Sequence, residues 1–229
     1  MRIYQSPSQV TNRKKVLTIE ESFGSSIFMY KGEQKMPTIS NALNAFRELL
    51  DYQYHFIISY SKKLFDILLV FDERDFHHLA GFQYLSDIDI PKSAKQLFSK
   101  IDSGKINDDI LSNSVNYLKV NDSYANVKDR IYGLQYLCEY IESNNTIFKY
   151  VKNMNRYSLI KADFMIKSIV NHKEAYIFIR KRSKSDTYCI CSFFVNPSAE
   201  YKGIRSYWLY RSKINILNDT EEVFIDKLK

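Results

Sequence analysis

Hydrophobic and polar positions change their spacing near residue 145 of the chain. Before that point apolar residues follow the period of an amphipathic helix, whereas after it they alternate with polar residues, as in a strand. Short turns separate the alternating runs, so an antiparallel meander is their simplest connection. The pattern predicts an α+β fold, with N-terminal helices and a hairpin followed by a four- to five-stranded antiparallel meander sheet.

Residues 37–144 form the predicted helical part. Within it, Pro91 is expected at the first position of a helix that ends at Ile101. An apolar stripe further along predicts one continuous helix from about Asp122 to Glu142. Two β-prone runs near the start of this part predict a hairpin: Tyr54–Tyr60 and Leu64–Phe71.

Residues 145–217 form the predicted sheet, with strands expected at Ser158–Lys167, Glu174–Arg182, Thr187–Val195 and Ser206–Ile216. One face of the second strand carries side chains that suit a nucleic acid: Tyr176, Phe178, Arg180 and Arg182. Neighbouring strands are expected to add Lys161, Asp163, Tyr188 and Ser192 to that face. Two uses of Tyr176 and Phe178 remain open: they stack bases on an open face, or they cover helices while only the arginine tips reach water.

The first part of the chain, residues 1–36, differs from the rest because polar residues and glycine interrupt it. It is expected to form an N-terminal arm or a small β extension, with β-prone runs at Val16–Ile19 and Ser26–Tyr30. The main domain is then predicted to cover residues 37–229.

Lysine and arginine are concentrated in the last third of the chain. Residues 1–144 contain 17 Lys/Arg against 18 Asp/Glu, whereas residues 145–229 contain 16 against 8. Within residues 145–216 the imbalance is 14 against 4. Such a basic surface favours an anionic partner, with nucleic acid as the first candidate, although the same excess could serve solubility alone.

Several classes of protein are disfavoured by what the sequence lacks. No apolar run reaches the length of a membrane span, and the polar, basic start is unlike a secretory signal. Cys138, Cys189 and Cys191 make an odd number, and a bridge between the last two would be strained, so free thiols in a reducing cytoplasm are expected. No signature of a cofactor or of metal-ligand spacing is recognisable, so we expect neither.

The remaining chemistry is acid–base catalysis or binding alone. A histidine suits catalysis near neutral pH, but His77 and His78 are adjacent on a predicted helix and point about 100° apart, so at most one can serve a given site. RNA cleavage fits this minimal equipment, because RNA supplies its own 2′-hydroxyl nucleophile. The protein then needs only a base, an acid and cations at the scissile phosphate.

Residues 71–88 resemble the motif Phe-[Tyr/His]-His-Leu-x-Gly-[Leu/Phe]-x-x-Leu-x-Asp-Ile of the fourth phage-associated family in the barnase–EndoU–colicin–RelE nuclease superfamily. Weaker matches follow, and the resemblance covers about residues 40–217. It implies helices followed by a four-stranded meander sheet, and metal-independent RNase activity in phages and other mobile elements. His78 occupies the histidine position of the motif, while Ser192, Tyr201 and Lys202 match weaker positions.

We therefore predict a metal-independent endoribonuclease, or a nuclease-like effector or toxin of a phage or mobile element, acting on RNA rather than DNA in the host cytoplasm. The candidate catalytic residues are His78, Ser192 and Tyr201. The candidate nucleic-acid-binding residues are Lys161, Arg180, Arg182, Lys202 and Arg205. The alternative is a non-catalytic protein that binds nucleic acid, or inhibits a protein partner, through the same basic face. A structural phage component is a third reading.

Overall fold

The computed structural model describes residues 38–117 and 127–228 of the chain. The predicted N-terminal arm, residues 1–36 with its two β-prone runs, lies outside the described residues, so both the arm and the domain boundary beside it stay predictions.

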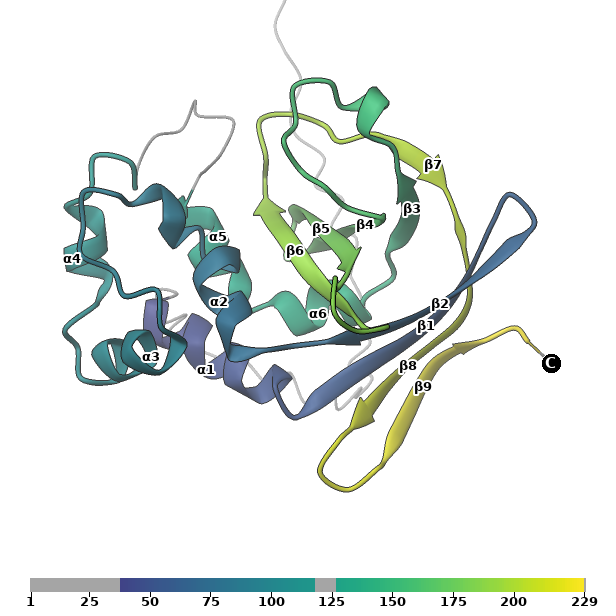
Figure 1. Cartoon of the computed structure of the whole chain (residues 1–229), viewed down its shortest axis with the longest axis horizontal. Coiled ribbons are helices and arrows are strands. Elements are labelled where there is room, and N and C mark those ends of the chain that lie inside the picture. Colours follow the sequence, from purple (N-terminus) through teal and green to yellow (C-terminus); the bar gives the residue numbers. More distant parts are fainter. Residues whose placement is uncertain (1–37, 118–126, 229) are drawn as a thin grey trace, which may run out of the picture. The chain divides into compact units, whose positions relative to one another are not determined.

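The described residues contain helices and strands in an irregular order (Figure 1). The helices are α1 (Ile39–Leu49), α2 (Glu73–Leu79), α3 (Ala94–Asp102), α4 (Asp108–Ser112), α5 (Val127–Leu134) and α6 (Leu137–Glu142), with short 3-10 helices η1 (Phe82–Tyr84) and η2 (Lys152–Met154). The strands are β1 (Tyr52–Tyr60), β2 (Lys63–Val70), β3 (Thr146–Tyr150), β4 (Phe164–Val170), β5 (Lys173–Lys181), β6 (Tyr188–Val195), β7 (Gly203–Arg205), β8 (Tyr207–Asn215) and β9 (Glu221–Asp226).

The described strands form one nine-stranded sheet in the order β7-β3-β4-β5-β6-β2-β1-β8-β9. Neighbours pair antiparallel except β2 and β6, which run parallel and meet at Leu69 and Tyr188. β7 lies at one end of this order and β8 near the other, yet only Ser206 separates them along the chain. The sheet is therefore curled, and its two ends reach the same stretch of chain (Figure 1).

The α+β class is confirmed, but the predicted four- to five-stranded antiparallel meander is wrong, because the sheet has nine strands and is mixed. The consecutive strands β3 to β6 are only part of it. The hairpin β1–β2 joins the same sheet beside β6, where its apolar face shares the main core. The sequence signal missed three strands: β3, which has five residues, β7, which has three, and β9, whose side chains are largely exposed and therefore lack alternation.

Two hydrophobic clusters hold the described part of the fold together. The main core lies between the helices and one face of the sheet, and it includes Leu43 and Phe46 of α1 and Ile177 of β5. The opposite face of β4 to β6 carries a second, smaller cluster around Tyr176 and Phe178. These central strands are therefore buried on both faces, so their hydrophobic pattern does not distinguish an open face from a covered one.

The predicted strand Ser158–Lys167 is too long at its start, because β4 begins only at Phe164. The preceding residues form a loop instead. Two hydrogen bonds turn the chain there: the Ser158 amide donates to the Asn155 carbonyl at 3.0 Å, and the Ile160 amide donates to Ser158 Oγ at 3.2 Å. Such local bonds compete with pairing in a sheet.

Two helix predictions also need correction. The helix after Pro91 begins at Ala94, with Ser93 as its extended N-cap residue. The predicted continuous helix from Asp122 to Glu142 is two helices, α5 and α6. Tyr136, the residue before α6, has ψ of 11° and interrupts the helical run.

Gly133 of α5 shows how closely this helix lies against β6. A Cβ atom placed on Gly133 would be 2.4 Å from Cγ2 of Val195 and 3.1 Å from the ring of Phe193. Both neighbours are buried core residues. The missing side chain is therefore what allows α5 to rest on the sheet.

We predict that Gly133→Ala lowers the free energy of unfolding by about 1–3 kcal/mol, because the added methyl group overpacks the contact with Val195. Urea unfolding of the full chain measures this loss. The exposed helical residue Ser99 gives the matched control, since Ser99→Ala is expected to change stability by less than about 0.5 kcal/mol. Equal stability of the two variants would contradict the close packing.

Candidate active site

A pocket of about 580 Å³ lies beside the second cluster and collects most of the predicted site residues. Six of the eight candidates line it: His78, Lys161, Arg180, Ser192, Tyr201 and Lys202. They come from α2, from β5 and β6, and from the segments that precede β4 and β7. Sequence reasoning therefore identified residues that the fold brings together from five separate places. Their chemical roles stay predictions.

Helix α2 carries His78, and its first turn is held by a capping box. The Asp72 side chain accepts from the Arg74 amide at 2.9 Å, and the Asp75 side chain accepts from the Asp72 amide at 3.1 Å. These bonds satisfy backbone donors that have no partner within the helix. The sequence Asp-x-x-Asp before the histidines is the local reason that the helix starts here.

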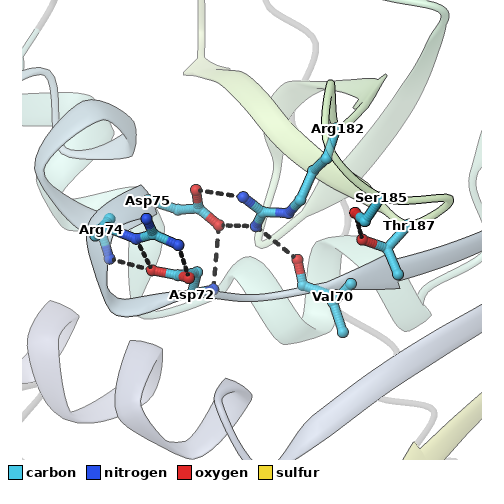
Figure 2. A network of polar contacts seen from close by, with 7 residues as sticks. All are labelled: Val70, Asp72, Arg74, Asp75, Arg182, Ser185 and Thr187. Carbon is cyan, nitrogen blue, oxygen red and sulfur yellow. Dashed lines mark hydrogen bonds and ion pairs between the residues drawn. The ribbon is translucent and has the colours of Figure 1, made fainter.

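Arg182 joins this capping box to the sheet, as Figure 2 shows. Its guanidinium donates to the Asp75 carboxylate and, at 3.2 Å, to the carbonyl oxygen of Val70 at the end of β2. The Arg182 and Asp75 side chains are only 25% and 16% exposed. Arg182 therefore uses its charge to fix α2 against the end of β5, and its predicted contact with nucleic acid stays a prediction that this pairing does not favour.

A β-bulge at Cys191 places the partner of His78. Across β5, Phe178 pairs with Ser192 and Ile179 pairs with Ile190, so Cys191 is the extra residue of β6. The Cys191 carbonyl oxygen is 2.8 Å from Nε2 of His78. A carbonyl only accepts, so Nε2 carries the proton and a neutral His78 has its lone pair on Nδ1.

The same bulge changes which side chains face the pocket. The sequence pattern placed Tyr188 and Ser192 on one face, but the extra residue reverses the alternation between them. Tyr188 packs against the main core, whereas Ser192 lines the pocket. Cys191 also bonds the opposite wall, because its thiol donates to the Lys161 carbonyl at 3.5 Å.

The surroundings of His78 favour its neutral form. Desolvation by the surrounding protein lowers the pKa of His78, and the nearby cations Arg130 and Arg180 lower it further, while the bond to Cys191 and the charge of Asp75 act in the opposite direction. A pKa below the usual value leaves the imidazole unprotonated at neutral pH, as a general base requires. His77 packs against the Phe82 ring instead and does not line the pocket.

Tyr201 and Ser192 form the inner wall with aromatic rings behind them. The Tyr201 ring lies 4.9 Å from that of Phe178 and 5.5 Å from that of Phe194, measured between centroids. Burial raises the pKa of Tyr201 to about 12, although Arg130 opposes the rise. The phenol therefore stays protonated at neutral pH and can donate a hydrogen bond, while Ser192 adds a hydroxyl beside it.

The predicted stacking face of Tyr176 and Phe178 is not open. Both side chains have 0% exposure, and they lie in the second cluster with Ile160 and Tyr201 packed over them. They are covered by the segments before β4 and β7. The open stacking face is therefore wrong, and the second alternative is right about the burial of both rings but wrong in naming helices as their cover. What reaches solvent from this strand face is Arg180.

The pocket-lining charge is mainly positive. Among the described residues, the lining contains one carboxylate, that of Glu200, and four cations: Arg156, Lys161, Arg180 and Lys202. Lys202 is held in place through its backbone, which exchanges two hydrogen bonds with the side chain of Asn155 at 2.7 and 2.9 Å. Arg205 is exposed on β7 and does not line the pocket, so its predicted role there is not supported by its position.

Arg130 of α5 is a charged residue near the site that sequence reasoning missed. It is 1% exposed, and its guanidinium lies over the rings of Tyr84 and Phe194. Its guanidinium carbon lies 4.0 Å from the Phe194 ring centroid, and burial lowers the pKa of Arg130 to about 10. The signal was available: Arg130 interrupts the apolar stripe of Val127, Ile131 and Leu134.

Three further features of the described residues bear on function. Within 38–117 and 127–228, no group of three or more His, Cys, Asp or Glu side chains is placed to hold a metal ion. No helix in the same ranges is long and apolar enough to cross a membrane. Cys138, Cys189 and Cys191 are free.

Comparison with known proteins identifies the family. A family model described as phage-Barnase-EndoU-ColicinE5/D-RelE like nuclease4 matches residues 38–227, which is nearly the whole described chain. The chain belongs to this nuclease family. The resemblance drawn from residues 71–88 is thereby confirmed, and the nuclease function of the family implies a nucleic-acid substrate. No curated protein and no solved structure matches the chain.

We predict that Arg182→Met lowers the free energy of unfolding by roughly 2–4 kcal/mol, because it leaves the half-buried Asp75 carboxylate without its partner. The control is a second Arg–Asp pair on the same helix turn. Arg74, whose side chain is 80% exposed, pairs with Asp72, so Arg74→Met is expected to cost much less than Arg182→Met. Chemical unfolding that ranks the two variants equally would contradict the anchoring role.

We also predict that His78 titrates below the usual histidine pKa of about 6.5, and that Arg180→Gln raises this pKa by removing a nearby cation. Arg180 is exposed, so the variant should fold normally. Arg205→Gln removes a cation outside the pocket and is expected to leave the titration unchanged. Histidine NMR signals followed against pH give the measurement. An unchanged His78 pKa in Arg180→Gln would refute the electrostatic coupling.

Proposed function

We propose that this member of the nuclease family is an endoribonuclease that cleaves RNA without a metal ion, using the 2′-hydroxyl of the substrate as nucleophile. The observation that carries the proposal is the pocket in which His78, Ser192 and Tyr201 face the cations Arg180 and Lys161. A base, hydroxyl donors and phosphate-binding cations in one place are the parts that such a reaction needs.

In the proposed reaction His78 acts as the base. Its Nδ1 takes the proton of the 2′-hydroxyl, and the 2′-oxygen attacks the phosphorus atom. The bond from phosphorus to the 5′-oxygen breaks, and this oxygen takes a proton from solvent. The products are a 2′,3′-cyclic phosphate and a free 5′-hydroxyl. The bond from Nε2 to Cys191 keeps the ring oriented and places the lone pair on Nδ1.

The other residues act on the phosphate and on the sugar. Lys161, Arg180 and Lys202 hold the phosphate and offset the charge that develops on its oxygens. Ser192 or Tyr201 orients the 2′-hydroxyl, and the raised pKa of Tyr201 suits a hydrogen-bond donor better than a base. Buried Arg130 adds positive potential from behind Phe194.

RNA is preferred to DNA in this proposal because DNA lacks the 2′-hydroxyl. The word phage in the family description supports an effector or toxin encoded by a phage or mobile element and acting in the host cytoplasm. A protein inhibitor or partner stays a prediction on the same basis.

The test is incubation of the purified full chain with several cellular RNAs in the presence of a chelator. The wild type is expected to cleave, and His78→Ala is expected to lose about 10²- to 10⁴-fold in rate. The matched control is the exposed turn residue His172, where φ is 60°. His172→Asn should keep full activity, since asparagine tolerates this backbone conformation.

Intact RNA with every substrate, or equal cleavage by His78→Ala, would overturn the proposed enzyme. Salt-sensitive RNA binding without turnover would instead support the non-catalytic alternative. In that case Lys161→Glu combined with Arg180→Glu should abolish binding, while Arg205→Glu should have a much smaller effect.

A further inference from the structure

The rim of the pocket carries an apolar surface that the proposed chemistry does not use. It is formed by the loop between β3 and β4, where Tyr157 is 99% exposed, Leu159 is 71% exposed and Met154 is 47% exposed. All three side chains line the pocket. Large apolar side chains that gather at the mouth of a pocket, and not singly over a surface, indicate a binding function.

The backbone beneath this surface is held in place although the side chains are free to contact a ligand. Asn155 is 9% exposed, and its side chain bonds the carbonyl oxygens of Val151 at 3.0 Å and Lys202 at 2.7 Å. Ser158 accepts from the hydroxyl of Tyr150 at 3.2 Å. The loop is thereby attached both to β3 and to the segment before β7, so a ligand that contacts Tyr157 need not order the loop first.

Cations from three segments line the pocket together with the apolar side chains. Arg156 and Lys161 belong to the same loop as Tyr157, whereas Arg180 comes from β5 and Lys202 from the segment before β7. A nucleotide suits such a surface, because its flat base can stack on an aromatic side chain while its negatively charged phosphate meets the nearby cations. The volume of about 580 Å³ lies in the range of ligand pockets.

We propose that Tyr157 is a stacking platform that makes the pocket select an unpaired nucleotide of single-stranded RNA. The base lies on the Tyr157 ring beside Leu159, and the phosphates extend toward Lys161 and Arg180. Bases in a duplex cannot use this platform, because their faces are already stacked on neighbouring pairs. The inference rests on the proposed function for its choice of RNA, but it concerns recognition and not cleavage.

The test measures binding with a substrate that cannot be cleaved. A short single-stranded RNA carrying 2′-fluoro groups lacks the nucleophile, so fluorescence polarisation with the full chain reports affinity alone. Tyr157→Ala is expected to weaken binding by roughly 5- to 150-fold, the effect of losing one base–aromatic stack. Tyr157→Phe keeps the ring and should remain within about 3-fold of the wild type.

Tyr207 is the matched control, because it is 62% exposed on β8 and does not line the pocket. Tyr207→Ala should leave the affinity unchanged. A duplex of the same sequence should bind more weakly than the single strand, and Tyr157→Ala should not change its affinity. Since neither tyrosine side chain is part of the core, a change in affinity does not reflect misfolding.

Equal affinities of Tyr157→Ala and Tyr207→Ala, equal binding of duplex and single strand, or no binding by the wild type would each overturn the inference. Its failure is distinguishable from that of the proposed enzyme. A Tyr157-dependent affinity without cleavage of natural RNA would leave the platform standing and refute the enzyme. Cleavage that depends on His78, with no effect of Tyr157 on binding, would do the reverse.

Discussion

The hydrogen bond from Nε2 of His78 to the carbonyl oxygen of Cys191 joins the helical part of the chain to its basic sheet. The proposed nuclease site needs both parts, because its histidine comes from the nearly neutral part and its cations come from the basic part. The bond depends on two constraints. The β-bulge of β6 presents the carbonyl, and the Arg182–Asp75 pair fixes the start of the helix that carries the histidine.

Basic residues of this chain have different structural roles that the sequence alone does not distinguish. Arg182 neutralises a half-buried carboxylate and orders the scaffold, while Arg180, two residues earlier, reaches the pocket. Arg130 is a third case, a buried guanidinium placed over an aromatic ring, whose charge acts on His78 and Tyr201 at a distance. The net charge of the sheet therefore favours an anionic partner, but only the structure shows which cations line the pocket and which are paired within the chain.

The local elements of the fold were predictable, because their signals are local. The β1–β2 hairpin, α2 with its acidic cap and the strands β5 and β6 follow from alternation, capping residues and turns. Their assembly was not, since the parallel contact of β2 with β6 joins distant segments. The burial of Tyr176 and Phe178 was not predictable either, because a strand buried on both faces has the same sequence pattern as one with an open aromatic face. The motif around His78 identified one member of the site, but the bulge at Cys191 that completes it leaves no pattern in the sequence.

The most direct test of the account is a pair of RNAs that differ by one atom. The RNA is first cleaved by the full chain in a chelator to locate the scissile bond, and the nucleotide on its 5′ side is then replaced by its 2′-deoxy counterpart. The account predicts that cleavage at that bond disappears and that the unmodified RNA yields a 2′,3′-cyclic phosphate end. Continued cleavage of the deoxy-substituted bond would contradict a reaction in which the RNA supplies the nucleophile and His78 removes its proton.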